Sequence, residues 1–229
     1  MKRLTLVAFI IISLGFSKLS AQIHELGVFV GGSNYIGDVG KTDYFIPNEM
    51  AYGVLYKWNQ SRRHAWRVSY IQSKLNGNDL KASESARVQR GYKFFNNIKE
   101  ISAGLEFNFF DFDLNSFSRN FTPYIYSGIS YTNFDEKYFV NGVSKTDSNK
   151  YTLAIPIIIG VKTRINQNFV LAAELGARYT YSDNLDGSNP KSDNLKAFRF
   201  GNTNSRDWYV FSGFTLTYSF GDKPCYCKN

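Results

Sequence analysis

Apolar and polar residues alternate with a period of two in eight segments of this chain, and this pattern is the strongest constraint on its fold. Successive side chains of a β-strand point to opposite faces, so sustained alternation indicates a strand with two unlike faces. Beyond residue 21, no stretch predicts a long helix. We expect an all-β protein with strands at residues 23–32, 49–58, 65–75, 98–110, 121–133, 152–163, 169–181 and 208–220.

Each predicted strand has one apolar face and one face of Gly, Ser, Thr and charged residues. In the segment 152–163, for example, the apolar face consists of Leu153, Ile155, Ile157, Ile159 and Val161. This pattern fits a soluble β-sandwich, whose apolar face is the core, and also an outer-membrane barrel, whose apolar face meets lipid. Alternation alone does not separate the two folds.

Three further features favour the barrel. Several runs reach 10 to 13 residues, whereas an ordinary strand has about 5–6 and a tilted membrane-spanning strand about 9–11. The connections alternate between short ones (59–64, 111–120, 164–168) and long polar ones (33–48, 76–97, 134–151, 182–207). Aromatic residues flank the runs where interfacial girdles would lie, at Trp58, Trp66, Tyr70, Phe109, Tyr131, Tyr179, Tyr181 and Trp208.

The sequence therefore predicts an eight-stranded antiparallel up-and-down transmembrane β-barrel with short periplasmic turns and long extracellular loops. An even number of strands places both termini of the mature chain in the periplasm. Eight strands leave an interior that side chains can fill. We expect a neutralising charge network there, in preference to a conduction path, formed by Glu25, Lys57, Arg67, Glu100, Glu106, Lys162, Glu174 and Arg178.

The first 21 residues have the pattern of a secretory signal peptide. Lys2 and Arg3 precede an apolar stretch from Leu4 to Phe16, which is too short to span a bilayer, and cleavage is expected between Ala21 and Gln22. We therefore divide the chain into a signal peptide (1–21), a barrel (22–220) and a periplasmic tail (221–229). Removal of the signal lowers the net charge from +8 to +5, which does not indicate a nucleic-acid partner.

The sequence offers no convincing catalytic or metal site. His24 and His64 both fall at the end of the barrel expected to face the periplasm, away from the outer rim where an enzyme of this type would act. The two cysteines supply at most half of a zinc site. A loop calcium site is a weaker alternative to solvated charge for six scattered acids, Asp38, Asp43, Asp79, Asp147, Asp183 and Asp186. We expect a non-enzymatic protein without a cofactor or metal.

The stretch HELGVFVGGSNYIGD, residues 24–38, is the most specific piece of sequence. From the residues alone, it is a first strand that turns through Gly31 and Gly32 into the first outer loop. Together with the aromatic eight-strand pattern and the ending FGDKPCYCKN, it resembles the PorG family of small outer-membrane barrels in the type IX secretion machinery of Bacteroidota. The resemblance covers essentially the whole mature chain. It implies that the chain anchors a periplasmic ring, built of a PorK-like lipoprotein and a PorN-like protein, in an export system that also supports gliding.

The two cysteines, Cys225 and Cys227, lie on the short tail after the last predicted strand. A local disulfide at this spacing would be strained and would close almost no loop, so it would stabilise little. Disulfides persist in the periplasm, and our hypothesis is an intermolecular disulfide with a periplasmic partner, which the resemblance suggests is the ring lipoprotein. A local disulfide or free thiols remain open. Arg62, Arg63, Arg164 and Lys223 are candidates for additional periplasmic contacts.

Two other functions remain open at this point. A surface barrel for adhesion or defence would act through its long outer loops. A small pore would need a water path through the charged interior.

Overall fold

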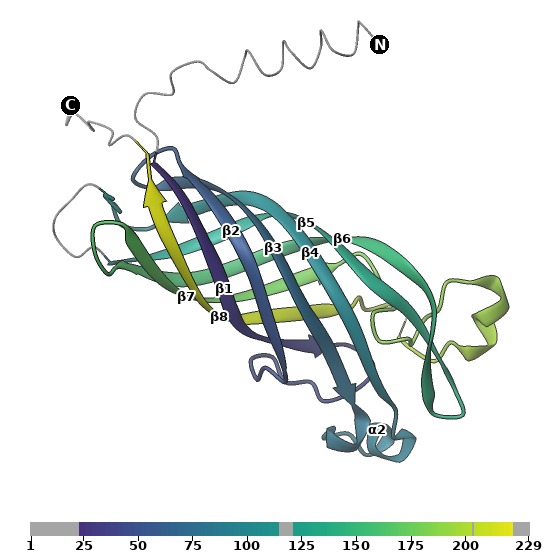
Figure 1. Cartoon of the computed structure of the whole chain (residues 1–229). Coiled ribbons are helices and arrows are strands. Elements are labelled where there is room, and N and C mark those ends of the chain that lie inside the picture. The colour runs from purple at the N-terminus through teal and green to yellow at the C-terminus, as the bar shows by residue number, and fades with distance from the viewer. Residues whose placement is uncertain (1–22, 115–120, 203, 222–229) are drawn as a thin grey trace, which may run out of the picture.

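The computed structural model describes residues 23–114, 121–202 and 204–221. Eight antiparallel strands close into a single barrel in sequence order, with β8 pairing back onto β1 (Figure 1). The strands are β1 (Ile23–Ile36), β2 (Glu49–Asn59), β3 (His64–Asn78), β4 (Lys93–Asn108), β5 (Phe121–Val140), β6 (Val143–Arg164), β7 (Phe169–Thr180) and β8 (Trp208–Phe220). The predicted fold class is confirmed.

The connections divide the barrel into two unlike ends. One end, here called the turn end, carries the connections 60–63 and 165–168, the described residues 109–114 of the connection after β4, the start of β1 and the end of β8 (Figure 1). The other, the loop end, carries the longer connections and three short helices, η1 (Asp79–Lys81), α2 (Ser85–Arg90) and η2 (Asp193–Phe198). Within the described residues, no helix is both long and apolar enough to cross a bilayer.

The strands around the fifth connection are longer than predicted. Residues 134–151, expected to form a loop, continue β5 and β6 to a two-residue turn at Asn141 and Gly142. Both turn residues have positive φ angles, 52° and 79°, and Asn-Gly is the dipeptide that best tolerates such a turn. Phe134 and Phe139 are buried, which explains why this segment is folded as a hairpin.

The first strand is also longer than predicted. Gly31 and Gly32 do not turn the chain, because β1 continues through both residues, paired with β2 as far as Ser33 and with β8 as far as Ile36. The glycines have a different role, which is to allow two strands to approach closely. A Cβ atom on Gly31 would lie 2.2 Å from the carbonyl oxygen of Ser212, and one on Gly213, the partner of Gly31, would lie 2.5 Å from that of Val30.

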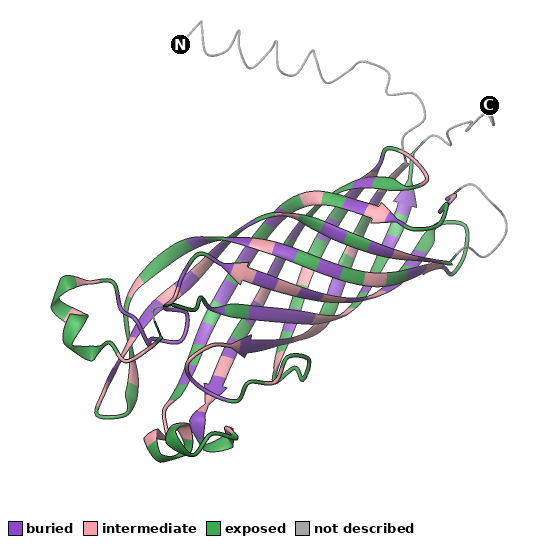
Figure 2. Cartoon of the chain, turned by 180° about the vertical axis from the view of Figure 1, so that it is seen from behind, coloured by how far each residue is buried: buried purple, intermediate pink, exposed green. Residues whose placement is uncertain are grey.

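The two faces of the wall differ as the sequence predicts. Figure 2 shows exposed and buried residues alternating along the strands. Most outward side chains are apolar, and many are more than half exposed, including Leu26 (56%), Ile129 (65%) and Phe214 (62%). Toward the turn end this apolar band ends in Trp66, Phe109 and Phe220, and toward the loop end in Tyr131, Tyr151, Tyr181 and Trp208, all of them exposed. An apolar band between two aromatic girdles is the exterior of a lipid-embedded barrel.

We predict that Gly213→Val weakens closure of the barrel between β1 and β8, because the added side chain would meet backbone atoms of Val30 and Gly31. Overpacking of this kind costs about 1–3 kcal/mol. Urea unfolding of the purified protein in detergent measures the loss. Ala173→Val is the matched control, because Ala173 points outward from β7 and has room for the methyl groups. Equal stability of the two variants would contradict this account of the glycine pair.

Candidate functional site

A network of buried charges fills the interior of the barrel. All eight charged residues expected to point inward lie there, with exposed fractions between 0% and 6%. They come from six strands, and four are acids and four are bases, so their formal charges cancel. The acids are Glu25, Glu100, Glu106 and Glu174, and the bases are Lys57, Arg67, Lys162 and Arg178.

Glu106 on β4 is the most highly connected of the acids. Its carboxylate lies 2.8 Å from the Lys57 ammonium and 2.6 Å from that of Lys162. The Arg67 guanidinium approaches it at 3.9 Å. Because β2, β3 and β6 each supply one of these bases, the cluster joins four strands across the barrel.

Arg67 forms a bidentate pair with Glu174 across the interior. Its two terminal nitrogens lie 2.7 and 2.9 Å from the two carboxylate oxygens, the geometry of the strongest charge-assisted hydrogen bonds. The hydroxyl of Tyr124 donates to the same carboxylate at 2.8 Å. Arg67 is on β3 and Glu174 on β7, so this pair spans the barrel.

A second pair lies closer to the loop end. Arg178 on β7 approaches Glu100 on β4 at 3.3 Å, and the hydroxyl of Tyr209 donates to Glu100 at 2.6 Å. Glu25, at the turn end, accepts hydrogen bonds from Asn59 and Thr217. Every acid of the network therefore has a donor at hydrogen-bond distance, and the charges are held in place by partners.

Substitution of one member of the Arg67–Glu174 pair should lower the free energy of unfolding far more than substitution of both members. Arg67→Met leaves Glu174 buried without its principal partner, and breaking such a pair costs about 3–5 kcal/mol. We expect the double variant Arg67→Met/Glu174→Gln to recover a large part of this loss. Chemical unfolding in detergent of the wild type, both single variants and the double variant measures the coupling. Additive losses would contradict the pairing.

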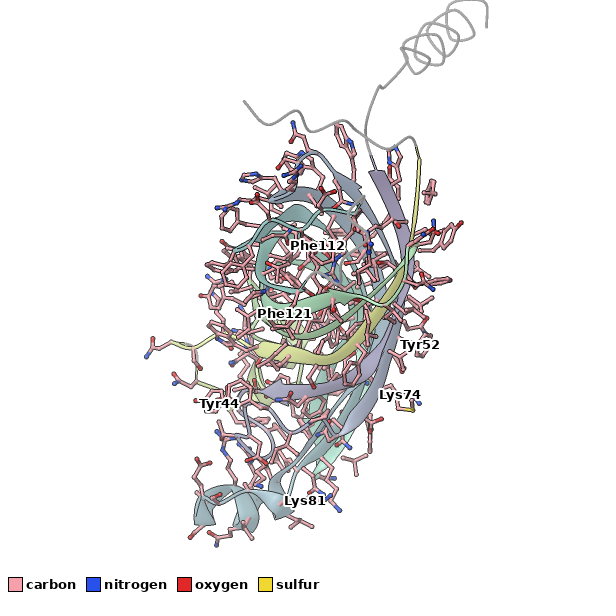
Figure 3. All side chains as sticks on the ribbon, turned by 90° about the vertical axis from the view of Figure 1, so that its left-hand side faces the viewer. Tyr44, Tyr52, Lys74, Lys81, Phe112 and Phe121 are labelled. Atoms are coloured by element: carbon pink, nitrogen blue, oxygen red, sulfur yellow. The ribbon has the colours of Figure 1, made fainter. Side chains whose placement is uncertain are left out.

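The turn end of the interior is closed by the connection between β4 and β5. Phe112 and Leu114 of this connection are buried and pack with Val170. Figure 3 shows Phe112 inside the ring of strands. The Lys162 ammonium lies 4.7 Å from the centre of the Phe112 ring, and the Arg164 guanidinium donates to the carbonyl of Leu114 at 2.7 Å.

The residues expected to make periplasmic contacts lie in different environments. Arg62 and Arg63 lie at the turn end and pair with Asp113 and Asp111, at 3.4 and 2.6 Å. Arg164 is only 5% exposed. Its side chain supports the buried connection at Phe112 and Leu114 from inside the barrel. It therefore does not face a partner, contrary to the expectation. Lys223, Cys225 and Cys227 lie outside the described residues.

The loop end is closed by a second, mainly hydrophobic plug. Val39 from the first loop and Leu185 from the last are almost fully buried among inward residues of the strands, including Phe94 and Phe139. The interior thus changes character along its length, from mainly charged near the turn end to mainly apolar near the loop end, where a few acids are also buried. Side chains occupy both parts.

Several loop acids are not solvated, contrary to the sequence-based expectation. Asp186 and Asp207 are no more than 1% exposed. They hold the plug through backbone amides, with Asp186 accepting from Val39 at 3.1 Å and Asp207 from Leu185 at 2.7 Å. Tyr35 donates its hydroxyl to Asp207.

Asp79 likewise binds the loops together. It is fully buried, accepts from the Gly40 amide at 2.7 Å and pairs with Arg90 at 2.7 Å. Asp43 is less enclosed and pairs with Lys41.

In the described part of the chain, no group of three or more His, Cys, Asp or Glu residues is arranged to hold a metal ion. Asp207 was not among the candidate acids, and only its position before β8 could have suggested it.

Burial and mutual repulsion raise the pKa values of three acids in the last loop. Burial, together with the charges of Asp38 and Asp186, raises the pKa of Asp183 to about 6. Burial also raises the pKa values of Asp186 and Asp207. An acid with a raised folded-state pKa stabilises the fold below its ordinary pKa, near 4, and this contribution is lost as pH rises through the folded value.

We therefore predict that the amides of residues 182–189 are better protected from hydrogen exchange at pH 4.5 than at pH 7.5, after correction for the intrinsic exchange rates. Asp183→Asn should reduce this difference, because the amide carries no charge at either pH. The amides of β3 serve as an internal reference. Protection that stays constant, or that increases with pH, would show that these acids do not loosen the loop.

The closed barrel, its apolar belt and its paired interior charges define the chain as an eight-stranded transmembrane β-barrel, the architecture of bacterial outer-membrane proteins. It belongs to the family described as a domain of unknown function (DUF6089), whose model matches residues 2–229. No curated protein matches the chain significantly.

Solved structures with a similar fold are bacterial outer-membrane barrels. The attachment invasion locus protein Ail of Yersinia pestis, in complex with the heparin analogue sucrose octasulfate, has 12% identity and a TM-score of 0.48, with 87% of this chain and 99% of Ail covered. The N-terminal barrel domain of Pseudomonas aeruginosa OprF has 12% identity and a TM-score of 0.44, with coverages of 87% and 97%. Neisserial surface protein A has 11% identity and a TM-score of 0.45, with coverages of 87% and 95%.

Proposed function

We propose that this chain is a non-enzymatic anchor in the outer membrane, which holds a periplasmic complex at the membrane through its turn end and tail. The observation that carries this proposal is the occupied interior. Paired charges fill one part of the barrel, apolar side chains fill the other, and a plug closes each end. Function is then expected on the exterior surfaces, and a conduction path is disfavoured.

The particular machinery and binding partners that we propose follow from the resemblance to the PorG family. The chain is proposed to belong to a type IX secretion and gliding machinery, and to bind a ring formed by a PorK-like lipoprotein and a PorN-like protein. The last strand ends at Phe220, so the cysteine-bearing tail starts at the same end as the exposed ion pair Arg63–Asp111. A disulfide through Cys225 or Cys227 would compensate for the small surface that short turns offer a partner.

This proposal predicts a covalent complex. A non-reducing gel of native outer membranes, with thiols blocked at lysis, should show a high-mass band containing this chain. The band should disappear on reduction and in Cys225→Ser/Cys227→Ser, and mass spectrometry would identify the partner. A single monomer band in both membranes would reject the disulfide. The non-covalent anchor would then be tested by co-isolation in mild detergent.

The co-isolation experiment needs a variant of the opposite end as its control. Replacement of Asp193–Phe198 by a Gly-Ser segment removes exposed η2 and leaves the buried residues 184–190 in place. The anchor proposal expects this variant to retain the periplasmic complex, and expects truncation after Gly221 to lose it. The reverse result would favour the adhesion or defence function, which acts through the outer loops.

A further inference from the structure

The first loop lies on the outside of the barrel wall. Asn34 on β1 and Val210 on β8 face outward as a cross-strand pair, yet they are only 2% and 3% exposed. The Asn34 amide donates to the carbonyls of Asp43 at 2.7 Å and Tyr44 at 3.3 Å. A Cβ atom on Gly32 would lie 2.5 Å from Pro47. The segment 43–47 therefore covers the exterior of β1 and β8 near the loop end.

This covering segment presents three consecutive apolar side chains outward. Tyr44, Phe45 and Ile46 are 59%, 66% and 61% exposed. In Figure 3, Tyr44 lies on the outer surface, on the side of the barrel away from Tyr52 and Lys74. A run of exposed apolar residues is unfavourable in water. Here it lies beside Trp208, at the loop-end edge of the apolar belt, where a lipid-facing surface would continue.

A recess of about 610 Å³ lies beside this segment, where the segment meets the wall. Its floor is apolar and comes from outward residues of three strands, Ile36, Ala177, Trp208 and Val210. Tyr44 and Phe45 form the opposite side. The recess therefore has the character of the lipid-facing surface, but it is more enclosed than the open wall.

Charged side chains line the polar rim of the recess. Two guanidinium groups, Arg87 and Arg206, line it together with one carboxylate, Asp38. Arg87 is committed to the fold, since it donates to the carbonyls of Gly37 and Gly40 and pairs with Glu84.

Arg206 is the more available cation. It is exposed, and one terminal nitrogen donates to the carbonyl of Tyr181 at 2.9 Å. Its guanidinium lies 5.3 Å from the centre of the Tyr181 ring, at the girdle. An interfacial cation above an apolar recess is suited to an amphiphile with an anionic head.

We infer that this recess binds one lipid of the outer leaflet, with its anionic phosphorylated headgroup on Arg206 and an acyl chain between Phe45 and the wall at Ala177 and Trp208. Charge complementarity and continuity with the lipid-facing belt support this occupant. The site lies at the opposite end of the barrel from the proposed anchor surface, so either proposal stands if the other fails.

Retention of phosphatidylglycerol tests the headgroup contact. Native mass spectrometry of the protein in dodecyl maltoside, titrated with phosphatidylglycerol or phosphatidylcholine, should reveal one tightly bound phosphatidylglycerol. Arg206→Gln should weaken this binding about tenfold, the size expected for a lost hydrogen bond between charged groups. Arg63→Gln, which removes an exposed arginine at the turn end, should leave it unchanged. Equal binding by the two variants would overturn the site, and displacement by millimolar inorganic phosphate would reject a lipid in favour of a free anion.

A spin label tests the position of the loop independently. In a Cys225→Ser/Cys227→Ser background and in vesicles, a label at Phe45→Cys should be more accessible to dissolved oxygen than to a water-soluble nickel complex. A label at Lys145→Cys, in the exposed hairpin of β5 and β6, should have the opposite preference. Mobility in unheated detergent gels checks that each variant is folded. Aqueous accessibility of Phe45 equal to that of Lys145 would overturn the proposal.

Discussion

Satisfaction of backbone hydrogen bonds in a medium without water is the constraint on which the rest of this structure depends. A sheet in hydrocarbon cannot leave an edge unpaired, so β8 must return to β1. The close contact at Gly31 and Gly213 belongs to this seam. Closure with eight strands then fixes a narrow interior, and the inward residues have to fill it with partners for every buried charge.

The interior of the barrel stabilises the fold, and the exterior surfaces at its two ends are left for recognition. Inside, Glu106 and Glu174 are paired with bases from other strands, and buried hydrophobic clusters lie toward both ends of the barrel. Outside, the turn end presents exposed arginine pairs, and the loop end presents the apolar segment at Phe45. This division is consistent with the proposed anchor at one end and with the proposed lipid-binding loop at the other.

The sequence predicted those features that depend on local periodicity. Alternation located all eight strands and indicated the inward direction of residues such as Arg67 and Glu174, because the strand period is fixed. It did not predict which charges pair, since Arg67 and Glu174 are 107 residues apart in the chain. The Asn141-Gly142 turn carried a local hairpin signal that the polar character of residues 134–151 concealed. The position of Tyr44 on the outer wall and the burial of Asp207 depend on tertiary contacts, for which the loops contain no periodic signal.

Four ion pairs of the interior connect strands that are not neighbours in the sheet. Arg67 on β3 meets Glu174 on β7, Arg178 on β7 meets Glu100 on β4, and Lys57 on β2 and Lys162 on β6 meet at Glu106 on β4. A half-built sheet would therefore carry these charges without their partners, next to lipid. Insertion must then be cooperative, with the charged strands shielded by water or by an assembly factor until the last strand closes the ring.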